Sequence, residues 1–172
     1  ALALEKAQIS ARESEERFRA IAEHLPGVVY QLFYEDDGRM RFTYISAGVK
    51  DLCELAPADI LADPECFFSL IHPDDRETVL RTSLEAFHRR TSWTSEWRIR
   101  TPSGRVKWIL GRDEPQQLAD GSYAWIWFAF DITERRQAEQ ILQDSERRLQ
   151  RILDELPAGV VIMRTQDSLG EV

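Results

Sequence analysis

The sequence predicts an α+β fold in which an antiparallel sheet is flanked by two amphipathic helices. Apolar residues recur at steps of three and four near both ends of the chain, which is the helical period. Between these segments apolar and polar residues alternate with the period of a strand, and turn residues join neighbouring strands. Links this short between strands favour antiparallel pairing.

Composition narrows the function classes. The chain has 172 residues, of which 43% are hydrophobic and 30% are charged, and its net charge is −8. This size suits one domain with connecting helices. The acidic balance argues against nucleic acid as a partner. No apolar run approaches the roughly 20 residues that cross a bilayer, so no membrane insertion is expected. Cys53 and Cys66 lack a CxxC spacing, which favours a reducing, cytoplasmic setting.

The segment Ser14–Pro26 is repeated as Ser145–Pro157, at an offset of 131 residues, and Gly-Val-Val follows both copies. A repeat of this length indicates tandem domain-sized units, each introduced by the same helix. We therefore expect a helix over residues 1–24, a domain over 25–132, a linker helix over 133–156 and the start of a second unit over 157–172.

Both predicted helices carry a narrow stripe of apolar residues, called the seam below, and the positions between them are mostly Glu, Arg and Gln. Its positions alternate in steps of three and four, as in a heptad repeat, and we expect the seam to pair two copies of the chain. The alternative is that each helix packs on its own domain. The predicted dimer seam includes Phe18, Ile21, Leu142, Leu149 and Ile152.

The first half of the domain reads as a hairpin followed by helices. Residues 27–34 and 40–46 alternate as strands around an Asp-Gly turn at 35–39. Short helical pieces follow over 47–70. Pro73 and two aspartates then mark the start of a helix that runs to about His88, with His72 preceding it.

Three strands complete the domain, over residues 95–100, 105–112 and 123–130. The last of them is apolar at every position, so both of its faces should be covered. Its faces carry either Tyr123, Trp125, Trp127 and Ala129 or Ala124, Ile126, Phe128 and Phe130, and either set could face inward.

The last strand runs directly into the linker helix. Asp131 is placed to cap that helix, and Glu134, three residues later, completes a capping-box spacing. A movement of the sheet would shift Asp131 and with it the helix. We therefore predict that Asp131, Thr133 and Glu134 couple the sheet to the helix.

Four segments together resemble a PAS domain with its C-terminal PAC segment, over residues 15–139. They are Phe18–Gly27, Ile71–Arg76, the strand pieces Glu96–Ile99 with Gly104 and Trp108, and Asp131–Arg136. The resemblance implies a five-stranded antiparallel sheet in the order 2-1-5-4-3 with short helices on one face. It also implies a sensory or dimerisation module that is joined to an output domain, such as a histidine kinase or a diguanylate cyclase, in the same polypeptide.

The resemblance further implies a pocket between sheet and helices. It favours the face of Trp125, Trp127 and Ala129 for this pocket, with the other face of that strand beneath the flanking helices. The bulky rings there either fill the pocket themselves or stack on a small-molecule ligand. Neither cysteine matches the flavin-attacking signature of the photoactive members, and each of the three histidines falls at an end of a predicted helix, so flavin, haem and metal are not expected. The predicted pocket residues are Tyr30, Tyr44, Trp97, Trp108, Trp125, Trp127 and Ala129.

No nucleophile elbow, phosphate loop or supported carboxylate pair marks a catalytic site. Two functions therefore compete: a sensory relay module that biases the exit helix, and a ligand-free dimerisation spacer. An enzyme in its own right is a formal third.

Overall fold

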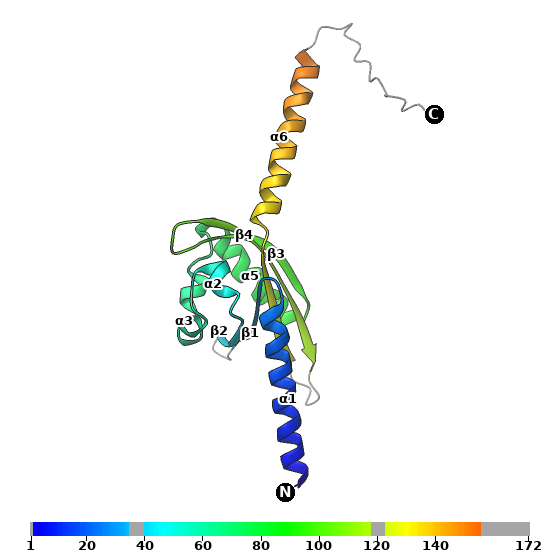
Figure 1. Ribbon diagram of the computed structural model, residues 1–172. Coiled ribbons are helices and arrows are strands. Elements are labelled where there is room, and N and C mark those ends of the chain that lie inside the picture. Colours follow the sequence, from blue (N-terminus) through cyan, green and yellow to red (C-terminus); the bar gives the residue numbers. More distant parts are fainter. Residues whose placement is uncertain (1, 35–39, 118–122, 156–172) are drawn as a thin grey trace, which may run out of the picture. The chain divides into compact units, whose positions relative to one another are not determined.

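The computed structural model describes residues 2–34, 40–117 and 123–155. It contains a five-stranded antiparallel sheet in the order β2-β1-β5-β4-β3, which confirms the predicted α+β class (Figure 1). The strands are β1 (Val28–Tyr34), β2 (Met40–Ile45), β3 (Trp93–Arg100), β4 (Val106–Gln117) and β5 (Tyr123–Asp131). The helices are α1 (Leu2–His24), α2 (Val49–Cys53), α3 (Pro57–Ala62), α4 (Glu65–Phe68), α5 (Pro73–Arg89) and α6 (Thr133–Glu155).

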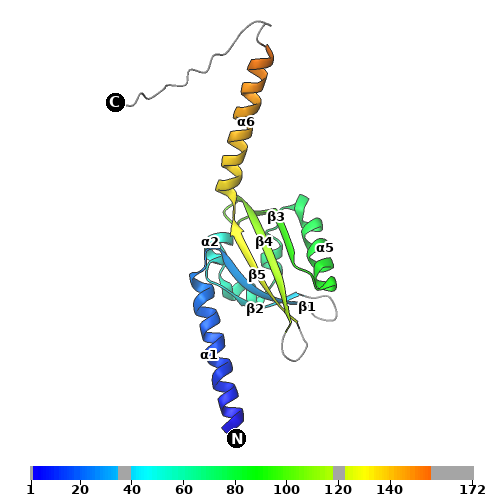
Figure 2. The same ribbon diagram turned by 90° about the vertical axis from the view of Figure 1, so that its right-hand side faces the viewer.

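The helices between β2 and β3 lie over one face of the sheet, as two perpendicular views show (Figures 1 and 2). Their apolar side chains join those of the covered sheet face in a single buried cluster, because both sets are removed from water together. Ile60 and Val49 are completely buried from the helical side, and Ile109 is 2% exposed from the sheet. This covered side is called the inner face below.

Helix α5 begins as predicted. The backbone N–H of Asp74 donates to Nδ1 of His72 at 3.3 Å, so His72 is the N-cap, and Pro73 occupies the first helical position. Asp75 then ties this helix to β3, because its Oδ1 lies 2.6 Å from Nη2 of Arg98. The hydrogen bonds from Arg98 hold the pKa of Asp75 below its ordinary value.

Strand β4 is longer than predicted and reaches Gln117 instead of Arg112. It pairs with β3 only as far as Asp113, whereas its pairing with β5 continues to the end through Pro115 and Gln116. A proline lacks a backbone donor and is tolerated where a strand has a neighbour on one side only. Pro115 therefore fits the exposed edge that β4 presents beyond β3.

The outer face of β5 is less covered than predicted. Ile126, Phe128 and Phe130 are half-buried, while Trp125, Trp127 and Ala129 on the inner face are buried. Helix α1 packs over the neighbouring strands instead: Ala22 is buried, and the ring of Phe18 meets that of Tyr44 at 5.6 Å. The outer residues of β5 thus form a partly exposed apolar strip.

The chain divides into two compact units, residues 1–134 and 135–172. The predicted turn at 35–39 and the expected second unit over 157–172 lie outside the described residues. Among the helices that the structure describes, none combines the length and apolar character needed to cross a membrane.

Candidate functional site

Aromatic rings fill the inner face of the sheet. Tyr30 stacks on Trp127 with 5.7 Å between ring centroids, and Trp127 meets Trp93 at 5.5 Å. Trp93 in turn meets Trp97 at 5.4 Å. Gly111 makes this packing possible, because a Cβ built on it would lie 2.1 Å from Cη2 of Trp97. The rings of Phe42, Phe67 and Phe68 extend the cluster toward the helices.

A small cavity remains inside this cluster. It measures about 20 Å³ for water-sized occupants, which is room for about one water molecule. Of the seven predicted pocket residues, Tyr30, Trp97 and Trp127 line it. Trp125 and Ala129 are buried on the same face; Trp125 packs against Phe87 with 4.4 Å between centroids.

Two predicted pocket residues lie on the opposite face. Tyr44 pairs with Gln31 while Phe42 pairs with Leu32, so a bulge at Thr43 breaks the alternation and turns Tyr44 outward. Its hydroxyl there donates to Oε1 of Glu23 at 3.1 Å, and desolvation together with this bond raises its pKa to about 12.

Trp108 precedes Ile109 on β4, and Ile109 faces inward, so the indole of Trp108 points outward. The guanidinium of Arg98 lies 5.7 Å from the centroid of that ring. Trp108 thus belongs to the solvent side of the sheet and not to the pocket.

Asp113 is an inner-face residue that the sequence did not predict. It is completely buried, and its Oδ1 accepts the backbone N–H of Trp93 at 2.7 Å. Its Oδ2 has no hydrogen-bond partner among the described residues, and the same holds for Nε1 of Trp127. Burial raises the pKa of Asp113 to about 6, although the bond from Trp93 opposes the shift. Ile109, Gly111 and Asp113 are two residues apart, so the alternation of a strand could have placed Asp113 on the inner face.

The joint between β5 and α6 is built by hydrogen bonds to β4. The N–H of Ile132 donates to the carbonyl of Trp108 at 2.8 Å, and the N–H of Trp108 donates to Oγ1 of Thr133 at 2.9 Å. Oδ1 of Asp131 accepts the N–H of Thr133 at 3.0 Å and its hydroxyl at 2.5 Å. The first helical residue is therefore held by two strands.

Helix α6 begins at Thr133, one residue later than a capping box at Asp131 and Glu134 would place its start. Asp131 instead makes a turn of the Asx type, bonding the backbone two residues ahead. Although burial acts in the opposite direction, the bonds from Thr133 and Lys107 keep the pKa of Asp131 below its ordinary value.

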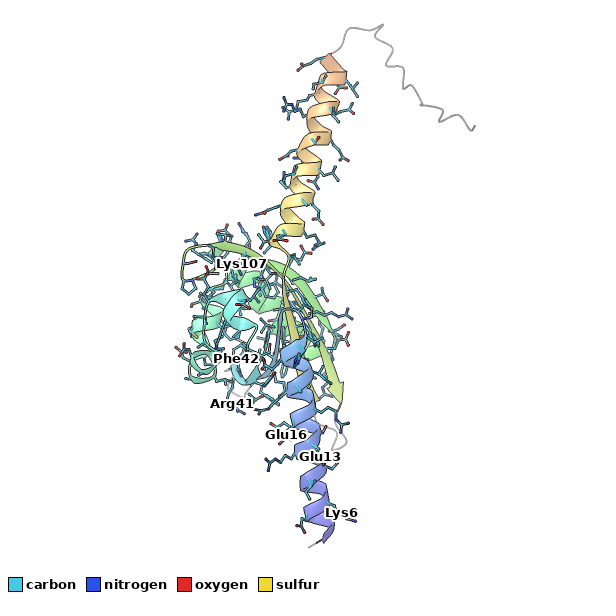
Figure 3. All side chains as sticks on the ribbon, viewed as in Figure 1. Lys6, Glu13, Glu16, Arg41, Phe42 and Lys107 are labelled. Atoms are coloured by element: carbon cyan, nitrogen blue, oxygen red, sulfur yellow. The ribbon has the colours of Figure 1, made fainter. Side chains whose placement is uncertain are left out.

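Lys107 links this joint to the helical layer. Its Nζ lies 3.2 Å from Oδ2 of Asp131 and donates to the carbonyl of Asp51, in α2, at 2.7 Å. Its side chain is only 14% exposed. Figure 3 labels it at the end of the sheet where β5 stops. An open cleft of about 760 Å³ borders it, lined among others by Glu23, Gly27, Lys50 and Phe130.

The predicted seam residues are mostly exposed. Ile21 is 57% exposed on α1, whereas Phe18 is half-buried against Tyr44. On α6 no described residue is buried, and the seam side chains of Leu142, Leu149 and Ile152 are 61%, 59% and 48% exposed.

Comparisons with known proteins give a consistent picture. A family model described as PAS fold matches residues 42–129. An uncharacterized protein, y4lL of Sinorhizobium fredii, is 33% identical over 75% of this chain, and a methyl sulfide methyltransferase-associated sensor of Methanosarcina acetivorans is 25% identical over 86%. The chain spans about 15% of the length of each of these relatives.

Solved structures share the fold. A sensory box histidine kinase/response regulator from Burkholderia thailandensis is 26% identical, with a TM-score of 0.52 over 72% of this chain and 91% of that one. The N-terminal domain of a diguanylate cyclase with PAS/PAC sensor from Marinobacter aquaeolei is 19% identical, with a TM-score of 0.53 over 63% of this chain and 98% of that one.

Proposed function

This chain belongs to the PAS fold family, and on that premise we propose that it is a sensory relay module of a multidomain signalling protein. Its output domain, in the same polypeptide, would be a histidine kinase or a cyclic di-GMP enzyme. The neighbours described as sensor parts of a histidine kinase and of a diguanylate cyclase support this class of protein. Two free cysteines support a reducing, cytoplasmic setting.

One set of contacts supports the proposed relay between the helical layer and α6. A continuous set of contacts leads from the carbonyl of Asp51 through Nζ of Lys107 to Asp131 and on to Thr133. A shift of α2 against the sheet would move the ammonium of Lys107 and thereby change the contacts of the first residue of α6. In this proposal Asp131 and Thr133 couple sheet and helix, and Lys107 positions them. Glu134 lies in the first turn of α6, where its negative charge complements the helix dipole.

Hydrogen exchange tests this relay in the 172-residue chain. Lys107→Met removes the ammonium and keeps an unbranched chain of similar length. We expect the backbone N–H groups of the first turn of α6 to exchange about fivefold faster, which corresponds to a local loss of about 1 kcal/mol. Because coupling is reciprocal, Asp131→Asn should also speed exchange in α2.

Arg112→Met is the matched control, since Arg112 lies on the same strand and pairs with Glu114 on the exposed face. It should leave both α2 and α6 unchanged. Unaltered exchange in α6 in the Lys107→Met variant would refute the relay.

The second candidate is a dimerisation spacer, which the exposed apolar seam of α6 favours. A narrow stripe of this kind pairs with another helix. Sedimentation should show a dimer for the wild type and a monomer for the double variant Leu142→Lys, Leu149→Lys. The control Gln143→Lys, Gln150→Lys adds the same charge at the same spacing beside the seam and should remain dimeric. A wild-type monomer at all concentrations would exclude the pairing.

A further inference from the structure

The carboxylate of Glu23 fixes the end of α1 to the segment that precedes α2. Its Oε2 accepts the backbone N–H of Ala47 at 2.9 Å, and its Oε1 accepts the hydroxyl of Tyr44, in β2, at 3.1 Å. Glu23 lies in the last turn of α1, next to the buried Ala22, and Phe18 in the same helix meets the ring of Tyr44. A displacement of this turn therefore acts directly on the peptide group of Ala47.

The peptide group after Ala47 is bonded to α2. The carbonyl of Ala47 accepts the backbone N–H of Lys50, in the first turn of α2, at 3.0 Å. Helix α2 has five residues, and a helix this short depends on contacts outside itself for its stability. The bonds on the two sides of Ala47 thus join the end of α1 to the start of α2.

Helix α2 is also the first element of the proposed relay. The carbonyl of Asp51 accepts Nζ of Lys107 at 2.7 Å, and the same Nζ lies 3.2 Å from Oδ2 of Asp131. Since Asp51 follows Lys50 directly, the contacts of Glu23 lead into those of Lys107. The hydrogen bonds and the ion pair form a continuous path from α1 to the joint before α6.

Residues of this path border one open cleft. The cleft measures about 760 Å³, and its lining includes Glu23, Ala47, Asp51, Lys107 and Asp131. Groups beside open space can shift without displacing closely packed neighbours, whereas a packed interior resists such shifts. The aromatic cluster of the inner face leaves a cavity of only about 20 Å³. Small displacements should therefore cost less along the wall of the cleft than through the inner face.

We infer that Glu23 is the input residue of the relay, which transfers a displacement of α1 through Ala47 to α2 and then through Lys107 to the first turn of α6. The domain thereby couples its two flanking helices, and the input is a movement of α1. Glu23 is a positioning residue, since it acts on α6 through α2 and Lys107. The inference rests on the proposed function, because it adds an input to the same relay.

Hydrogen exchange in the 172-residue chain tests this inference. Glu23→Ala removes both acceptors at an exposed position, so the buried core should stay intact. We expect the N–H groups of Lys50 and of the first turn of α6 to exchange about threefold faster. Glu16→Ala is the matched control, since this carboxylate lies about two turns earlier on α1 and pairs with Arg12 of the same helix (Figure 3). It should leave both α2 and α6 unchanged.

A double variant separates coupling from a local structural role. Lys107→Met already breaks the path between α2 and Asp131. Adding Glu23→Ala to it should still speed exchange at Lys50 but should change α6 no further. A further increase of about threefold in α6 would overturn the inference, because Glu23 would then act on α6 by another route.

Unchanged exchange in α6 after Glu23→Ala alone would also overturn it. The relay itself is judged separately, by exchange in Lys107→Met with Glu23 in place. If that variant speeds exchange in α6 and Glu23→Ala does not, the relay stands and α1 is not its input.

Discussion

The hydroxyl of Thr133 and the backbone of Trp108 are joined by a hydrogen bond of 2.9 Å, which ties the first residue of α6 to the first residues of β4. The same oxygen donates to Asp131. The side chain of Thr133 thus accepts the N–H of Trp108 in β4 and donates to the carboxylate of Asp131 at the end of β5.

Replacing Thr133 by Val keeps the shape of the side chain and removes both bonds. Because the N–H of Trp108 then loses its partner, we expect the free energy of unfolding to fall by about 1–2 kcal/mol in urea titrations. Thr133→Ser retains the hydroxyl and should lose much less. Equal losses in the two variants would mean that the methyl group, and not the hydroxyl, holds the joint.

Asp113 should make stability depend on pH in the direction opposite to most carboxylates. Burial raises its pKa to about 6 in the folded state, from the ordinary 3.8. Its contribution is therefore fully present below pH 3.8 and is lost as the pH rises through about 6. Asp113→Asn should therefore gain stability relative to the wild type over that interval. A constant difference in Tm from about pH 4 to about pH 7 would contradict this.

Glu54 should show the opposite behaviour. Hydrogen bonds from Arg105 and Ser103 lower its pKa to about 2, from the ordinary 4.5. The stability that this group contributes is present above pH 4.5 and is lost as the pH falls toward 2. The gap in Tm between the wild type and Glu54→Gln should therefore close between about pH 5 and about pH 2. A gap that stays constant in acid would show that the contacts of Glu54 do not depend on its charge.

Gly111→Ala should destabilise the inner face. The added methyl would lie 2.1 Å from Cη2 of Trp97 and 3.3 Å from Cζ3 of Trp93, so the rings must move. Overpacking of this kind typically costs about 1–3 kcal/mol, which chemical denaturation would measure. Gly104→Ala is a useful comparison. No atom lies within 4 Å of its added Cβ, so any loss there reflects only its backbone φ of +85°. Gly111→Ala as stable as the wild type would contradict the tight packing.

Local patterns predicted much of the fold. Proline and aspartates after His72 predicted the start of α5. Period-two alternation predicted the first hairpin and β3, and a continuous apolar run predicted β5. The full length of β4 was not predicted, because Asp113 and Pro115 are poor strand formers. This part of β4 is a strand because it pairs with β5. The same gap hid Asp113 from the list of inner-face residues.

The site was harder to predict than the fold. Regular alternation would put Tyr44 on the same face as Phe42, and a single bulge at Thr43 reverses that inference. The spacing of Asp131 and Glu134 favours a capping box, but the ladder of β5 continues through Asp131 and delays the helix by one residue. Lys107 gave no sequence signal, since its two contacts come from residues that are distant along the chain.

Pro115 bears on the self-association of this chain at high concentration. Beyond Asp113 the edge of β4 is open on the side away from β5, and an open edge invites a strand from another molecule to add to the sheet. A proline has no N–H to donate to an added strand, so it interrupts the hydrogen bonds that such a strand could form with β4. The segment that lengthens the hairpin therefore carries its own protection against fibrous self-association.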